Sequence, residues 1–185
     1  MKKVTTIQPL FDYKNYFKSF FATTVNNSGY FSSGRISLYN GLQSLLLRNN
    51  NINHVLLPSF ICGEIAAVFK ELNIKTIYYQ LDKDLNIDFD FIEKNLSNIN
   101  HLLFIVNFFG FPSNWEKINS LKQKYNCFVI EDNAHSIFGK YNNIDFGKLG
   151  DISFNSLRKI LPLLSGSELS INITPELNDI YKKRK

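Results

Sequence analysis

The sequence predicts an α/β fold, with a mainly parallel sheet flanked by helices. Short, almost continuously apolar runs alternate along the chain with longer segments whose apolar residues recur at helical spacing. Strands separated by helices in this way are typical of βαβ units and parallel sheets. No internal repeat or low-complexity linker interrupts the alternation.

The order of the elements follows from local patterns. Apolar residues fall mostly on one helical face in 35–50, and acidic residues open 88–96, where they favour the first turn of a helix. The run 54–58 ends at a proline, which closes a short buried strand. We therefore expect helices within 35–50, 63–72, 88–96 and 114–126, and strands within 54–58, 75–80, 101–110 and 127–132.

Composition narrows the class of protein. The chain has 185 residues, 44% of them hydrophobic, which suits one folded domain with a sizeable core. No apolar run reaches the length of a membrane span, and the start has no signal-peptide core, so a cytoplasmic protein is expected. Two cysteines, Cys62 and Cys127, have no paired spacing, which argues against a disulfide framework or a metal site.

The net charge of +5 does not indicate a nucleic-acid-binding protein. The basic residues are scattered, and only the segment 181–185 (YKKRK) gathers them. A nucleic-acid groove needs basic residues on one face beside stacking aromatic side chains. We expect no nucleic acid among the partners.

Polar residues follow several of the expected strands. Asp132 and His135 come after the strand 127–132, while Asn107 and Ser59 follow apolar runs of two others. Ligands of open α/β sheets bind beyond the carboxyl ends of the strands. Any one of these residues could be an ordinary turn or cap. Together they predict a site at this edge.

Two further segments carry candidate chemistry. Lys159 follows Ser156 in an apolar stretch, where partial desolvation would make the amine a better nucleophile, although a lysine can also extend its charge to solvent there. Arg158 beside it can pair with an anion. The segment 32–35 (Ser-Ser-Gly-Arg) opens the first helix, where free N–H groups can bind phosphate or a serine can act as an N-cap.

A helix start, a carboxylate and a lysine are the three groups needed to hold pyridoxal phosphate. In such a site the helix N–H groups hold the phosphate, the carboxylate keeps the pyridine nitrogen protonated, and the lysine bonds to the aldehyde carbon.

The motifs carry a resemblance to a known family. The segment 55–88 (VLLPSFICGEIAAVFKELNIKTIYYQLDKDLNID), the segment 102–136 (LLFIVNFFGFPSNWEKINSLKQKYNCFVIEDNAHS) and the later SLRK resemble the DegT/DnrJ/EryC1/StrS sugar aminotransferases. These are pyridoxal-phosphate enzymes of fold type I. The resemblance covers about residues 30–173.

The resemblance implies a role for each matching residue. Lys159 corresponds to the Schiff-base lysine, Asp132 to the partner of the pyridine nitrogen, and His135 to a residue that contacts the cofactor ring or its phenolic oxygen. The implied phosphate-binding residues are Gly34, Arg35 and Ser156. The chain departs from the family at Cys62, where an aromatic residue is common, at Arg35, where threonine is more usual, and in the spacing of Ser153 and Ser156 from Lys159.

The implied organisation is an N-terminal segment (1–29), a cofactor-binding portion of the large domain (30–173) and a basic tail (174–185), with the small carboxyl-terminal domain absent. The implied function is transfer of an amino group, usually from glutamate, to a keto nucleotide-sugar for cell-surface polysaccharide such as O-antigen, by a homodimer. A truncated, inactive remnant that binds only cofactor or a partner is the alternative. A nucleotide-binding α/β domain is disfavoured because no G-x-G-x-x-G follows a first strand.

Overall fold

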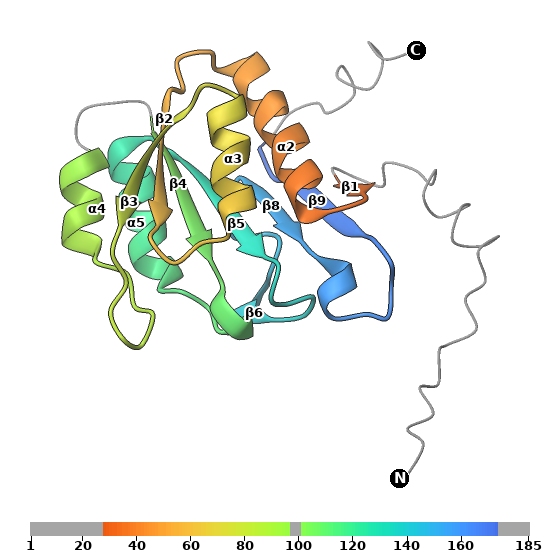
Figure 1. Cartoon of the computed structure of the whole chain (residues 1–185). Helices are drawn as coiled ribbons and strands as arrows, with labels where there is room; N and C mark the ends of the chain where they lie inside the picture. Colours follow the sequence, from red (N-terminus) through yellow and green to blue (C-terminus); the bar gives the residue numbers. More distant parts are fainter. Residues whose placement is uncertain (1–27, 97–100, 174–185) are drawn as a thin grey trace, which may run out of the picture.

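A seven-stranded sheet forms the centre of the protein (Figure 1). The computed structural model describes residues 28–96 and 101–173, so most of the expected N-terminal segment and the basic tail lie outside the described residues. The sheet has the order β1-β9-β8-β5-β4-β2-β3. Its strands are β1 (Ser28–Phe31), β2 (His54–Pro58), β3 (Lys75–Tyr79), β4 (His101–Val106), β5 (Phe128–Asn133), β8 (Ile152–Asn155) and β9 (Ser167–Ile171).

Helices cover both faces of the sheet (Figure 1). One face carries α2 (Gly34–Arg48) and α3 (Gly63–Glu71), and the other carries α4 (Phe89–Leu96) and α5 (Trp115–Tyr125). Two 3-10 turns, η1 (Phe108–Gly110) and η2 (Leu157–Lys159), and a hairpin of β6 (Lys140–Tyr141) and β7 (Ile144–Asp145) complete the described elements. Within the described ranges, none of the helices has the length and apolar character needed to cross a membrane.

Strand β4 shows why the sheet needs two helical layers. All six of its residues are buried, and they alternate between two apolar clusters. Phe104 packs with the cluster under α2 and α3, whereas Leu103 and Ile105 pack with the cluster that contains Trp115 of α5. A fully buried side chain of this kind contributes about 1.5–3 kcal/mol, so covering both faces is strongly favoured.

The predicted fold class is confirmed. Strands β2, β3, β4, β5 and β8 run parallel, and each of the four expected helices is present within a residue or two of its predicted ends. One prediction was wrong in its second half, because the strand expected over 101–110 ends at Val106. The chain turns there because Phe109 (φ 53°) and Gly110 (φ 84°) adopt left-handed conformations, which cannot continue a strand.

Strands β8 and β9 and the edge strand β1 were not predicted. Both pairings of β9 are antiparallel, with β8 on one side and β1 on the other. Strand β9 contains two serines, and buried Ser167 is stabilised by hydrogen bonds to the Ser37 hydroxyl and the Asn155 carbonyl. These partners lie far away in sequence, so a local hydrophobic pattern does not reveal the strand.

Candidate functional site

A cavity of about 490 Å³ lies at the carboxyl ends of β4, β5 and β8. It is bounded by the start of α2 on one side, by the start of α3 on another and by η2. It is lined by the six residues to which the family resemblance gave a role: Gly34, Arg35, Asp132, His135, Ser156 and Lys159. The structure thus brings together residues separated by more than a hundred positions, because strands β4, β5 and β8 end and helices α2 and α3 begin at one edge of the sheet.

Asp132 forms the buried acid of the cavity. It pairs with Val106 and Phe154 across the neighbouring strands, and its side chain is only 4% exposed. Burial raises the pKa of Asp132 to about 7, while the Ala134 N–H (2.8 Å) and the positive charge of Lys159 act in the opposite direction. Asp132 is therefore a carboxyl group that a cationic ligand would ionise.

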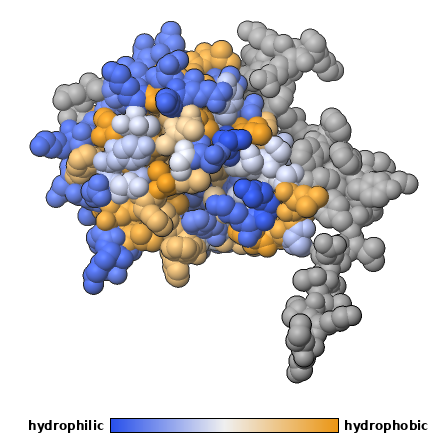
Figure 2. Space-filling view, in the orientation of Figure 1, coloured by the Kyte–Doolittle hydropathy of each residue, from blue (hydrophilic) through white to orange (hydrophobic). Residues whose placement is uncertain are grey.

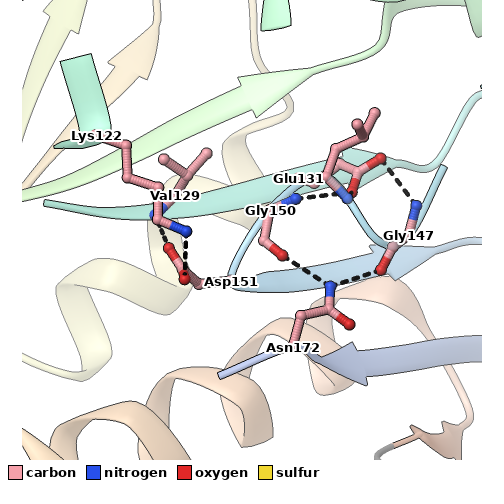
Figure 3. Close-up of polar contacts among 8 residues, drawn as sticks. Lys122, Val129, Glu131, Gly147, Gly150, Asp151 and Asn172 are labelled. Atoms are coloured by element: carbon pink, nitrogen blue, oxygen red, sulfur yellow. Dashed lines mark hydrogen bonds and ion pairs between the residues drawn. The ribbon is translucent and has the colours of Figure 1, made fainter. Parts of the chain in front are cut away.

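Glu131 points to the other face of the sheet, since successive side chains of a strand alternate. Its carboxylate is fully buried and accepts backbone hydrogen bonds from Gly147 (2.9 Å), Leu149 (3.1 Å) and Gly150 (3.1 Å). Figure 3 shows this acid beside the loop that leads into β8. Glu131 is therefore a structural anchor, and only the second acid of the Glu-Asp pair enters the cavity.

The same loop is fastened at two further points (Figure 3). Asp151 accepts a hydrogen bond from the backbone N–H of Val129 (2.8 Å) and pairs with Lys122 of α5 (2.6 Å). The amide of Asn172 donates to the carbonyls of Gly147 (2.8 Å) and Gly150 (2.7 Å). These contacts fix the start of β8, and hence the place where η2 leaves the sheet.

Lys159 and Ser156 reach the cavity from η2. Ser156 is buried at the N-cap of this turn, and its hydroxyl makes no capping hydrogen bond. Lys159 is exposed, which agrees with the second of the two alternatives left open by the sequence, namely a lysine that extends its charge to solvent. The reason is that η2 is a single turn at the rim, followed by the exposed residues Ile160 and Leu161. Lys159 still lines the cavity, and its positive charge lowers the pKa of both Asp132 and His135.

The first turn of α2 offers backbone donors to the cavity. Ser33 is the N-cap residue but makes no side-chain cap, and Gly34 follows it. A Cβ at Gly34 would lie 3.2 Å from the Phe154 ring and 3.3 Å from the Asn155 carbonyl, so glycine permits this close approach. Arg35 also lines the cavity, and its guanidinium pairs with Glu64 of α3.

Aromatic rings form a wall that the sequence analysis did not single out. Phe60 and Phe108 lie with centroids 5.8 Å apart, and Phe108 lies 6.4 Å from His135. Partial burial and the positive charge of Lys159 lower the pKa of His135, which favours the neutral imidazole. The available signal was the position of each phenylalanine two residues after a strand end, Pro58 of β2 and Val106 of β4. Cys62 is exposed on the same wall.

Asn107 and Ser59 of the expected edge do not line this cavity, and neither does Ser153. Asn107 is buried, but its side chain forms hydrogen bonds with Asn133 (2.8 Å) and Trp115 (3.2 Å), so it supports the packing between β4, β5 and α5. Ser59 donates to Gln80 (3.1 Å) at the surface, and Ser153 accepts from Asn133 (3.1 Å). In the described ranges no group of three His, Cys, Asp or Glu side chains converges as a metal site would require.

Comparison with known proteins identifies the family. A family model described as the DegT/DnrJ/EryC1/StrS aminotransferase family matches residues 13–166. The chain belongs to this family. It is 28% identical over 134 residues to the GDP-perosamine synthase of Escherichia coli O157:H7, a match that covers 72% of this chain and 35% of that enzyme. An uncharacterized protein of Methanocaldococcus jannaschii is 24% identical over 140 residues, which cover 75% of this chain and 34% of the relative.

Solved structures show the same fold. An aminotransferase of the family from Brucella abortus superposes with a TM-score of 0.68 at 20% identity, over 87% of this chain and 45% of that one. The E. coli GDP-4-keto-6-deoxy-D-mannose-3-dehydratase with bound hydrated PLP has a TM-score of 0.67 at 18% identity, over 86% and 42%. The fold is thus that of the pyridoxal-phosphate-dependent aminotransferases. The chain spans about a third of the length of its curated relatives.

Proposed function

We propose that this chain is the cofactor-binding portion of a pyridoxal-phosphate-dependent aminotransferase that acts on a keto nucleotide-sugar. The observation that carries the proposal is the single cavity in which a buried carboxyl (Asp132), an amine (Lys159) and the start of a long helix (Gly34) converge. Family membership supports it. So do solved relatives that hold PLP.

The residues present fit this cofactor. Its phosphate requires several hydrogen-bond donors, which the first turn of α2 and the uncapped hydroxyl of Ser156 provide. Its pyridine nitrogen requires a carboxylate, and a buried one favours a protonated partner most strongly. Asp132 is a buried carboxyl of this kind. Gly34 leaves room for the phosphate, because a Cβ there would lie close to the Phe154 ring and the Asn155 carbonyl.

Each side chain has a distinct task in the proposed reaction. Bound pyridoxal phosphate supplies an electron-withdrawing ring that stabilises negative charge on the substrate carbon. Lys159 is the nucleophile that attaches the cofactor and the base that moves a proton at that carbon. Asp132 keeps the pyridine nitrogen protonated, and the imidazole of His135 offers a hydrogen bond from the cavity wall.

The substrate class rests on the relatives. GDP-perosamine synthase and GDP-4-keto-6-deoxymannose-3-dehydratase carry nucleotide-sugars in their names, so we propose a nucleotide-linked keto-sugar as acceptor and glutamate as amino donor. We further propose a cytoplasmic homodimer that serves polysaccharide synthesis such as that of O-antigen. In domain terms, residues 30–173 are the cofactor-binding portion, preceded by the segment 1–29 and followed by the basic tail 174–185.

An inactive, cofactor-binding fragment is the second candidate. It is favoured by one observation, namely that the matched region is only 35% of the length of GDP-perosamine synthase. Both candidates require Lys159 and Asp132 to hold the cofactor. They differ in whether amino transfer follows binding.

The test is attachment of the cofactor to Lys159. The purified chain mixed with pyridoxal phosphate and reduced with borohydride should gain one pyridoxyl group on the peptide that contains Lys159, found by mass spectrometry. The variant Lys159→Ala should lose the label and the visible absorbance. Lys148→Ala is the matched control, because that exposed lysine pairs with Asp145 away from the cavity. Equal labelling of wild type and Lys159→Ala would refute the assignment.

A further inference from the structure

The turn after β4 makes a second kind of contact with the site, beyond the aromatic wall. Phe109 adopts a left-handed backbone conformation (φ 53°), which a phenylalanine seldom takes. Gly110 follows with φ 84°. Two consecutive left-handed residues reverse the chain sharply, and strain of this kind persists only where surrounding structure holds it.

The reversal directs Phe109 at His135 in two ways. Its backbone N–H donates to the Nδ1 atom of His135 at 3.4 Å. Its ring stacks on the imidazole with centroids 5.4 Å apart and an interplanar angle of 17°. A neutral imidazole has one donor and one acceptor nitrogen, so a donor aimed at Nδ1 leaves the proton on Nε2.

We propose that Phe109 is a positioning residue: its N–H and ring fix the orientation of His135, so that Nε2–H is the donor presented to a hydrogen-bond acceptor on the bound ligand. This inference rests on the proposed function for its ligand, the cofactor, although the contact itself belongs to the chain alone. Phe109 then acts through His135 and need not touch the cofactor.

The charges around His135 fit this arrangement. Lys159 from η2 and Asp132 from β5 line the same cavity, and Arg35 of α2 pairs with Glu64 of α3 across it. Arg158 also lines the cavity from η2. Protonation of His135 would place a hydrogen on Nδ1 against the Phe109 N–H and add a cation near Lys159. Both effects favour the neutral ring, in agreement with its lowered pKa.

Histidine NMR on the cofactor-free protein tests the contact directly. In the wild type we expect the backbone amide resonance of Phe109 to shift with pH at the same midpoint as the His135 ring, because the ring nitrogen accepts its hydrogen bond. His135→Gln should abolish that titration. Phe109→Ala should raise the midpoint of His135 by about half a pH unit, since one face of the ring regains water and the hydrogen bond loosens.

Two variants make the result specific. Phe111→Ala removes an exposed ring two positions away and should leave the His135 midpoint unchanged. The backbone N–H of Phe111 donates to the Phe108 carbonyl and not to His135. Phe109→Tyr keeps the stacked ring and should retain the wild-type midpoint. A Phe109 amide that does not follow His135, or an unchanged His135 midpoint in Phe109→Ala, would overturn the proposal.

The cofactor provides an independent arm. If the wild type binds pyridoxal phosphate, Phe109→Ala should shift the pH profile of its visible absorbance, whereas Phe111→Ala should not. A coupled Phe109–His135 titration in a protein that never binds the cofactor would refute the proposed function and leave the positioning contact intact. Binding of the cofactor without that coupling would refute only the positioning role.

Discussion

Asp132 illustrates how a buried acid can lower the folding stability of the cofactor-free protein and still serve the proposed site. Its carboxyl lies at the end of β5, 4% exposed, with the Ala134 N–H as its hydrogen-bond donor. Burial raises its pKa from 3.8 to about 7, so the folded state binds the proton more tightly than the unfolded chain does. The contribution of this group therefore becomes less favourable as pH rises from about 4 to about 7.

The variant Asp132→Asn tests the predicted direction of this pH dependence of stability. Asparagine keeps an oxygen for the Ala134 N–H but carries no charge, so the cofactor-free variant should match the wild type near pH 4 and exceed its unfolding free energy by up to about 4 kcal/mol at pH 8. Urea denaturation across this pH range measures the difference. A variant less stable than the wild type at pH 8 would contradict the argument.

The same variant should bind pyridoxal phosphate more weakly. Without the carboxylate, the protonated pyridine nitrogen has no buried partner, and we expect a loss of about tenfold or more in cofactor affinity. Absorbance titration at pH 8 provides the measurement. Stability gained together with affinity lost would show that Asp132 is kept for the site and not for the fold.

At this scale the sequence predicted the positions of site residues better than their surroundings. Asp132 could be found because a buried strand must end in a turn, and an acid at that point lies at the ligand edge. The sequence left the burial of Lys159 open, because its apolar neighbours Ile160 and Leu161 could equally be buried or, as the structure has them, exposed at the rim. The part that Phe109 plays depends on a backbone conformation that residue type does not reveal.

Among the elements, strand β8 is held in place by Glu131 of its neighbour. The carboxylate of Glu131 accepts three backbone hydrogen bonds from the loop 147–150, and further hydrogen bonds from the amides of Asn107 (3.3 Å) and Asn133 (2.9 Å). Strand β8 leads directly to Ser156 and Lys159. Glu131 thereby supports the turn η2 with its N-cap residue Ser156, and we propose that Ser156 and Lys159 bind the cofactor.

Glu131→Gln should destabilise the fold. The amide end of glutamine brings a donor to a position surrounded by donors, so at least one buried N–H loses its partner, and we expect a loss of about 2–4 kcal/mol. Chemical denaturation measures it. Asp145→Asn is the control, because Asp145 pairs with Lys140 and Lys148 at an exposed hairpin and should show no comparable loss. Equal effects of the two changes would refute the anchoring role.

The elements that the sequence located are those with local signals. Strands β2 to β5 each contain a short apolar run, and the helices between them repeat apolar residues with a helical period, so both were predicted. Strands β1 and β9 lack such a signal. Gly29, Ser167 and Ser170 take strand conformation only because distant partners pair with them, Gly29 with Leu169 and Ser170 with Ser28. Non-local pairing of this kind cannot be read from a window of sequence.

At the scale of the whole molecule, several large apolar side chains are exposed, and Phe60 among them lines the cavity. Phe60 is 59% exposed, Phe109 66% and Leu164 83%. Figure 2 shows hydrophobic side chains gathered on the lower part of the face in view, the side on which the strands end in Figure 1. Adjacent exposed apolar groups favour association.

We expect the purified chain to self-associate at micromolar concentration, and Leu164→Lys to reduce its mass in light scattering. An unchanged mass in Leu164→Lys would argue against self-association through this surface.

Catalysis makes a stronger demand on the whole molecule than cofactor binding does. The residues proposed to hold pyridoxal phosphate come from the described part of the chain, but Lys159 and His135 lie exposed at the rim, where water would compete for the reacting atoms. We therefore expect the 185-residue chain to bind the cofactor without sustained amino transfer. The assay is turnover of glutamate with a panel of keto nucleotide-sugars, with Lys159→Ala as the baseline. Turnover well above that baseline by a soluble sample would show that the exposed rim suffices for catalysis. A protein that binds the cofactor but turns over no faster than the baseline would support the inactive fragment.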